Sequence, residues 1–169
     1  MDIEGEFAPA TAAAARERYA ALGSTAQVVV REVAKAMAMD ADEYDRRVTS
    51  DVVETARDAL FASLLQVRVG SRAEYGSWLA EEGYDETAVE EVGSEHVDNV
   101  VWHAAPTGVV VAATFQDEHR AAVETLRRRA FGRVYRDLVA GSGSDADDGA
   151  DGDGGADADD GTGTDSADE

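Results

Sequence analysis

The 169-residue chain has no cysteine, one lysine and two prolines. Without cysteine it can form no disulfide, thiolate metal site or cysteine nucleophile. It also lacks any run approaching the roughly 18 consecutive apolar residues of a membrane span. Residues 1–10 carry acids where a secretory signal would be basic. These absences predict a cytoplasmic protein without a membrane partner.

Acidic residues are as abundant as lysine is scarce. Thirty-six Asp and Glu stand against fourteen arginines and Lys35, which gives a formal net charge of −21. Such a charge strains a compact fold by self-repulsion in dilute buffer. At about 1 M salt the Debye length falls to about 3 Å, and most of that repulsion is screened. The composition therefore predicts a halophile's protein that works in molar salt.

The composition changes sharply after Val139. Residues 141–169 contain eleven acids, eight glycines and no large apolar residue. Such a segment cannot bury enough apolar surface to offset the entropy of ordering. The sequence therefore predicts one folded domain over 1–140 and a disordered acidic Gly/Asp/Ala tail over 141–169.

The first half of the domain is predicted to be helical. Helices are expected over 9–22, 24–39 and 51–65, with a short one opening at Asp40. In the second of these, the apolar positions share one face: Val29, Val33, Ala36 and Met37.

The second half alternates strands with helices. Strands are expected at 67–69 and at the edge over 88–92, separated by a helix over 71–83 that opens with a capping box. A β-hairpin over 97–115 precedes a last helix over 117–139. The predicted class is α+β, with N-terminal helices packed on a small antiparallel sheet and a long C-terminal helix.

The register of the hairpin decides which side chains share a face. If Ala104 pairs with Val109, one face is the core face. Its members are Val100, Trp102, Val111, Ala113 and Phe115. The opposite face then carries Val101, His103, Val110, Ala112 and Thr114. That second face would need a cover, which favours a partner protein or a second copy of the chain.

The last helix holds the only basic cluster. On a helical wheel, Arg120 and Arg127 fall inside its apolar arc. A guanidinium on a buried face needs a carboxylate or a bound anion. The expected internal partners are acids of the helix over 51–65: Asp51, Glu54 and Asp58. The alternatives are an anionic ligand or a partner's surface.

The three histidines do not form a metal pattern. His96 and His103 would point to opposite faces of one strand, and neither has a histidine partner at helical spacing. His103 is predicted to be a structural histidine. Phosphate-binding loops, nucleophile elbows and zinc-protease motifs are missing from the sequence. We predict no cofactor and no metal.

Nucleic-acid binding is the least favoured function class. The helices near 24–65 have helix-turn-helix lengths, but the expected recognition helix is acidic and would repel phosphates. The arginine-rich last helix is the better candidate surface, yet it lacks interleaved exposed aromatics.

The order of several segments resembles a known family. They are VREVAKAM, VVETARDALFASLL, VVWHAAP and ATFQDEHRAAVETLRRRAFGRVYR, followed by an acidic end. Together they are similar to a small haloarchaeal family of unknown function, which would cover 1–140. The resemblance implies no activity and no catalytic residue.

Two function classes follow from the sequence. The first is a non-catalytic binding or regulatory module, for which a homodimer is one expected form and which the absence of catalytic motifs favours. The alternative is a small enzyme or anionic-ligand-binding domain built around Arg127, Arg120 and His103. A hollow converging on Arg127 would reverse the preference.

Overall fold

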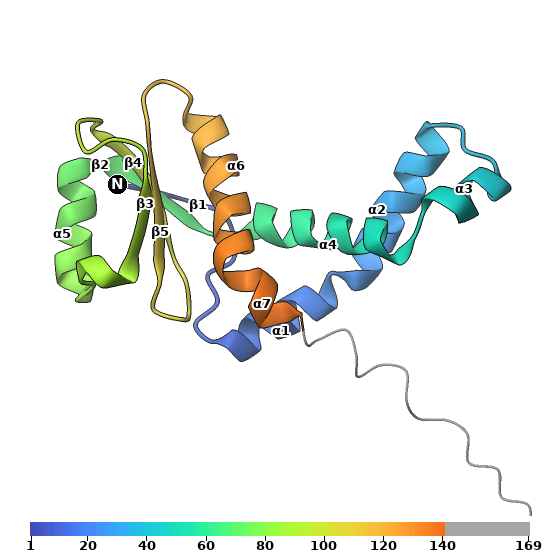
Figure 1. The fold of residues 1–169 in the computed structure, drawn as a ribbon, viewed down its shortest axis with the longest axis horizontal. Helices are drawn as coiled ribbons and strands as arrows, with labels where there is room; N and C mark the ends of the chain where they lie inside the picture. Colours follow the sequence, from blue (N-terminus) through green and yellow to red (C-terminus); the bar gives the residue numbers. More distant parts are fainter. Residues whose placement is uncertain (141–169) are drawn as a thin grey trace, which may run out of the picture.

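A computed structural model describes residues 1–140, in which helices cover both faces of a five-stranded sheet. Figure 1 shows this body at one end of the molecule and a helical arm projecting from it. The predicted α+β class is therefore confirmed. The tail predicted over 141–169 lies outside the described residues.

The sheet has the strand order β1-β2-β4-β5-β3. Its strands are β1 (Asp2–Glu4), β2 (Val67–Ser71), β3 (Val89–Val92), β4 (Asn99–Ala104) and β5 (Val110–Phe115). All neighbours pair antiparallel except β3 and β5, which pair in parallel. The expected antiparallel sheet is therefore mixed. The chain reverses twice between β3 and β5, so these two strands run the same way and meet at the sheet edge.

The hairpin register differs by one residue from the prediction. Ala104 pairs with Val110, because Val109 belongs to the connecting loop, where its carbonyl accepts the Ala105 N–H at 2.8 Å. One face of the hairpin therefore carries Val100, Trp102, Val110 and Ala112, in contact with the helix α5 (Arg72–Glu82). The other face carries Val101, His103, Val111 and Ala113. The sheet face expected to lack a cover is not found. Val101 lies on one face and Val110 and Ala112 lie on the other, and all three are fully buried.

Two predicted capping signals are confirmed, whereas the helices expected from 24 and 51 begin at Gly23 and Ser50 without a side-chain cap, and the helix expected from 9 begins at Ala12. Asp40 accepts the N–H of Glu43 at the start of α3, and Ser71 and Glu74 form a reciprocal capping box on α5. The helices are α1 (Ala12–Ala21), α2 (Gly23–Ala36), α3 (Ala41–Arg47), α4 (Ser50–Leu64), α5 (Arg72–Glu82), α6 (His119–Ala130) and α7 (Arg136–Val139). A 3₁₀ turn, η1 (Glu86–Ala88), precedes β3, and a π-helical turn, η2 (Phe131–Tyr135), joins α6 to α7.

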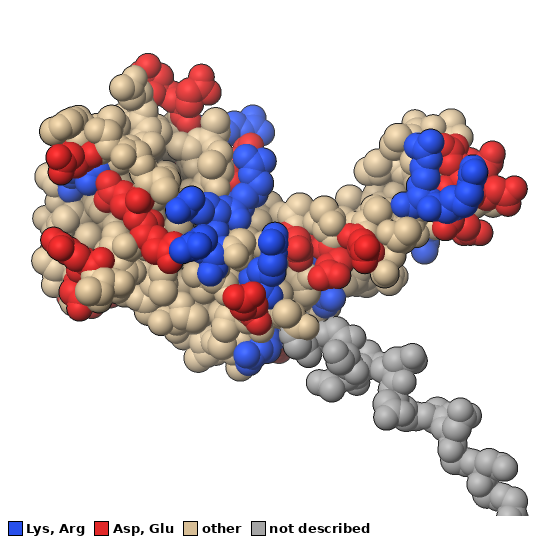
Figure 2. Space-filling view, in the orientation of Figure 1, with Lys and Arg blue, Asp and Glu red and all other residues tan. Residues whose placement is uncertain are grey.

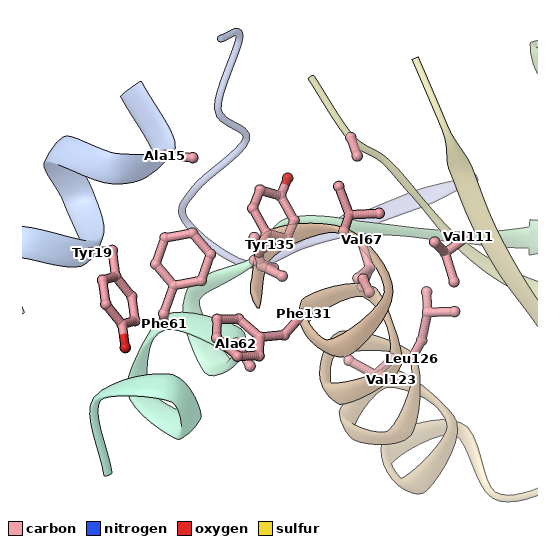
Figure 3. Close-up of a cluster of buried hydrophobic side chains, with 14 of the residues drawn as sticks. Ala15, Tyr19, Phe61, Ala62, Val67, Val111, Val123, Leu126, Phe131 and Tyr135 are labelled. Carbon is pink, nitrogen blue, oxygen red and sulfur yellow. The ribbon is translucent and has the colours of Figure 1, made fainter. Parts of the chain in front are cut away.

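The main core lies between the sheet and the helices α1, α4 and α6. Figure 3 shows Phe61 at its centre, with Tyr19, Phe131 and Tyr135 around it. The ring centroids of these three lie 5.9, 5.8 and 5.2 Å from that of Phe61. Buried aromatic side chains contribute large apolar areas and prefer such tilted contacts. This cluster fixes the helices against one face of the sheet.

A second, smaller cluster covers the other face of the sheet. Tyr75 and Trp78 of α5 pack against Trp102 of β4, with ring centroids 5.0 and 5.7 Å away. The remaining buried members of this cluster are Val100, Val110 and Ala112. The sheet is therefore filled on both faces by the chain's own helices.

Candidate functional site

His103 is a structural histidine in the main core. Its Nδ1 lies 2.6 Å from the backbone carbonyl of Gln66, and its Nε2 lies 2.7 Å from the hydroxyl of Tyr135. A carbonyl can only accept, so Nδ1 carries the proton and Nε2 accepts from Tyr135. Burial lowers the pKa of His103, and Arg68 and Arg127 lower it further. The ring is therefore held neutral and has both nitrogens occupied.

Arg127 lies on the inner side of α6, but its predicted carboxylate partner is wrong. Its Nε donates to the backbone carbonyl of Leu65 at 2.8 Å, and no ion pair of Arg127 occurs within residues 1–140. Leu65 caps the C-terminal end of α4, where carbonyls carry partial negative charge. The acidic side chains of α4 lie farther back along the helix. Arg127 therefore binds the C-terminal end of α4 and not one of its carboxylates.

Arg120 was expected on a buried face, and this expectation is wrong. Its side chain is 92% exposed and its Nε lies 3.2 Å from Oε1 of Glu124. Arg120 stands in the first turn of α6, whereas the first buried residue of that helix is Val123. The apolar arc thus begins one turn after Arg120, which leaves only a surface pair worth little.

The three predicted residues are not brought together around a hollow. His103 and Arg127 bind the carbonyls of consecutive residues, Gln66 and Leu65, in the link between α4 and β2. Their arrangement therefore ties β4 and α6 to that link. Arg120 lies apart from both on the surface.

The basic side chains of the last helix form a ridge with acidic neighbours. Figure 2 shows blue side chains along α6 flanked by red patches. Arg133 donates through Nε to Oε2 of Glu90 at 2.6 Å, and this contact lowers the pKa of Glu90. Arg133 and Arg120 are thus each paired with an acid, which neutralises part of the positive charge of this ridge.

No helix over residues 1–140 is long and apolar enough to cross a membrane. Over the same range, no group of three or more His, Asp or Glu side chains is arranged to hold a metal ion.

The feature that stands out is the arm formed by α2, α3 and α4. Figure 1 shows these helices extending away from the sheet. The chain's exposed large apolar residues gather there, since five of the eight within residues 1–140 lie on α2, α4 or directly after α2. They are Val28, Val29, Val33, Met37 and Val52. Contiguous exposed apolar surface marks interaction sites.

The helical period explains the apolar stripe. Ala26, Val30 and Ala34 are the buried residues of α2, which packs along α4. Val29, Val33 and Met37 follow one another four residues apart, directly beside the buried row, and Val33 and Met37 are 52% and 60% exposed. The apolar arc of α2 is therefore wider than α4 alone can cover. We call this row the α2 stripe.

The base of the arm is fixed by contacts that sequence analysis missed. The Tyr19 hydroxyl donates to Oδ1 of Asp58 at 2.7 Å, and Nε of Arg57 donates to the Tyr19 carbonyl at 2.6 Å. The Arg57 guanidinium also lies 4.1 Å from the centre of the Tyr19 ring. Burial and the Asp58 contact raise the pKa of Tyr19. The wheel pattern alone carries no signal for such a long-range cluster.

A hollow of about 440 Å³ opens beside this base. Its charged lining consists of Arg57 and Arg136 together with Glu54 and Asp58. The formal charges of these four side chains cancel, since two are basic and two are acidic. Neither Arg127 nor Arg120 lines it.

Comparison with known protein families gives a match over most of the described chain. A model of a family of unknown function, DUF5809, matches residues 6–136. Comparisons with curated proteins and with solved structures gave no match. The matched span includes the arm, the smaller core cluster and every buried member of the main cluster except Val139, so the arm is part of the family's domain.

Proposed function

The chain belongs to the DUF5809 family, whose function is unknown, and we propose from its geometry that it is a non-catalytic binding module that acts as a homodimer through the arm. The observation that carries the proposal is the α2 stripe. In water, an apolar stripe on a projecting helix costs free energy that a partner surface would recover. The proposal places the protein in the cytoplasm of a halophile, as its composition favours.

Packing against a partner would stabilise the arm more than the rest of the domain. Only Ala26, Val30 and Ala34 of α2 are buried, and the first eleven residues of α4 include none that are buried. Helices of this length are marginal in isolation and depend on packing. Two arms side by side would complete a four-helix bundle with an interior for the α2 stripe.

Charge favours a second copy as the partner. Helix α2 carries Arg31 and Lys35 against Glu32, whereas α4 carries three acids against Arg57. A two-fold interface is self-complementary, so α2 of one copy can face α4 of the other. Opposite net charges would then meet on both halves of the interface, with Val52 of α4 available to contact the partner's stripe.

The test is the mass of the full chain in about 2 M KCl, where charge repulsion between copies is screened. Sedimentation equilibrium should give twice the 17.8 kDa chain mass. Val33→Asp should convert the dimer to monomer, because each dimer would bury two unpaired carboxylates. We expect the dissociation constant of the dimer to rise at least about 100-fold, where every 1.4 kcal/mol in the free energy of association is a factor of ten.

Ile3→Asp is the matched control. Ile3 is 54% exposed on β1, close to the 52% of Val33 on α2. It should therefore accept the same change and remain dimeric. A wild-type chain that is monomeric at high protein concentration, or a Val33→Asp chain that dimerises as wild type does, contradicts the proposal.

A further inference from the structure

The hollow beside the base of the arm lies where the arm meets the rest of the domain. Its lining comes from α1, α2 and α4 and from η2 and α7. Its volume of about 440 Å³ is within the usual range for sites that bind small molecules. Val53 of α4 and Phe131 of η2 give it apolar surface. The hollow therefore has room for a small molecule with an apolar part.

Tyr19 holds two opposite charges of this lining at its two ends. Nε of Arg57 donates to the Tyr19 backbone carbonyl, and the guanidinium lies over the Tyr19 ring. Asp58 accepts the Tyr19 hydroxyl through Oδ1. Arg57 and Asp58 are neighbours in the chain, yet they form no ion pair with each other. The same tyrosine therefore orients both charged groups and keeps them apart.

Both of these charged side chains keep polar atoms that no other residue of 1–140 binds. These atoms are the two terminal nitrogens of Arg57 and Oδ2 of Asp58. Both side chains are only half-buried, and none of the three atoms is among the buried unpaired polar atoms of the described chain. Solvent therefore reaches them. Because both residues line the hollow, a molecule seated there can replace that solvent.

A second pair of opposite charges completes the lining. Glu54 of α4 and Arg136 of α7 have exposed side chains, and neither forms an ion pair within residues 1–140. Glu54 lies four residues before Asp58, so these two carboxylates share one side of α4. The hollow therefore presents two carboxylates and two guanidinium groups that do not neutralise one another by direct contact.

We propose that this hollow binds a small zwitterion, namely a free α-amino acid with an apolar side chain. Arg57 and Arg136 would bind its carboxylate, because the guanidinium fork matches the two carboxylate oxygens. Asp58 and Glu54 would bind its ammonium group, and its side chain would lie against Phe131. A small anion or a small cation would leave one of the two sets of charged groups without a partner.

The test is a titration of L-leucine into the full chain at constant ionic strength in about 2 M KCl, where charge repulsion is screened. Amide NMR shifts of Gly23 and Gln27, which line the hollow, should change and saturate. 4-Methylpentanoate and 3-methylbutylammonium keep the branched chain of leucine, but each carries only one of its two charges. Each should bind about tenfold more weakly, because charge-assisted hydrogen bonds are lost. Absence of saturable shifts with leucine, or equal binding of either analogue, overturns the proposal.

Asp58→Asn tests the ammonium end of the site, because asparagine can still accept the Tyr19 hydroxyl but carries no charge. It should weaken leucine binding about tenfold. It should not weaken binding of 4-methylpentanoate, which has no ammonium group. Asp51→Asn, on the same helix but outside the lining, is the control and should bind leucine as wild type does. An unchanged leucine affinity of Asp58→Asn, or an equal loss for both ligands, overturns the assignment.

Arg136→Gln tests the carboxylate end. It should weaken leucine binding about threefold, because Arg136 is exposed and its charge is partly screened, and it should leave 3-methylbutylammonium binding unchanged. Arg128→Gln, exposed on α6 and outside the lining, should have no effect. An unchanged leucine affinity of Arg136→Gln overturns the placement of the carboxylate. Val33 does not line the hollow, so Val33→Asp should bind leucine as wild type does, and the two proposals fail separately.

Discussion

Tyr135 donates its hydroxyl proton to Nε2 of His103 across the main core, with 2.7 Å between the two atoms. Because Nδ1 of the same ring binds the Gln66 carbonyl, one imidazole joins β4, the link between α4 and β2, and the π-helical turn. Tyr135 is fully buried and His103 is 1% exposed. In this setting each unpaired polar atom would carry its full desolvation cost.

Tyr135→Phe should therefore destabilise the protein. It leaves the ring in place but strands Nε2 of His103 as a buried acceptor, and we expect a loss of about 1–3 kcal/mol in the free energy of unfolding. Denaturant unfolding at fixed salt and pH measures this loss. Tyr75→Phe is the matched control, since its hydroxyl has no protein partner, and it should cost little. Equal losses in the two variants would contradict the assigned bond.

The neutral state of His103 predicts a pH dependence. Burial lowers the pKa of His103 from its usual 6.5, so below pH 6.5 the unfolded chain binds a proton that the folded chain does not. Stability is then fully present above pH 6.5 and is lost as the pH falls from there toward the folded pKa. The slope should reach at most about 1.4 kcal/mol per pH unit.

A variant that keeps only His103 isolates this effect. His96 and His119 lie at the surface, and both can be replaced by Gln without disturbing the core. The double variant should retain the loss of stability just below pH 6.5, measured by denaturant unfolding at several pH values. If the slope disappears with the surface histidines, His103 is not its source.

Arg127→Met should cost about 1.5–3 kcal/mol, because it removes one charge-assisted bond to the Leu65 carbonyl at the end of α4. A buried ion pair would have cost about 3–5 kcal/mol by leaving an unpaired acid. Arg128→Met, at the next and exposed position, should change the unfolding free energy little. A loss above about 3 kcal/mol for Arg127→Met would indicate a carboxylate partner after all.

Local signals in the sequence predicted most of the elements. The caps at Asp40 and Ser71 act between residues three apart, so they are visible without a tertiary structure. The register of the hairpin could not be predicted from local signals, because it depends on whether Val109 pairs with the opposite strand or bonds Ala105 within the loop. A shift of one residue moves side chains to the opposite face. The shift therefore changes which hairpin residues share a face, while the expectation of an uncovered face is wrong because α5 packs on the face opposite the main core.

The candidate sites show the same limit. The wheel placed Arg127 on the inner side of its helix, but it could not show that a helix end lies opposite. It also grouped Val29 and Val33 on one face without revealing that α4 covers only the neighbouring row. The pair Arg57 and Asp58 gave no signal, since a residue of another helix holds both side chains beside the hollow. Residues distant in the chain set the surroundings of these side chains, and spacing along the sequence does not encode them.

Salt should stabilise this protein strongly if the composition reflects a halophile. The full chain carries a formal charge of −21, and screening reaches only about 10 Å at 0.1 M salt but about 3 Å at 1 M. The melting temperature should therefore rise steadily as KCl increases from about 0.1 to 2 M. The measurement belongs on Val33→Asp, because a dimer would add its own concentration-dependent stabilisation. A melting temperature that stays flat or falls over this range contradicts the halophilic hypothesis. Such a result would mean that salt mainly weakens surface ion pairs such as Arg133–Glu90 and relieves no larger charge repulsion.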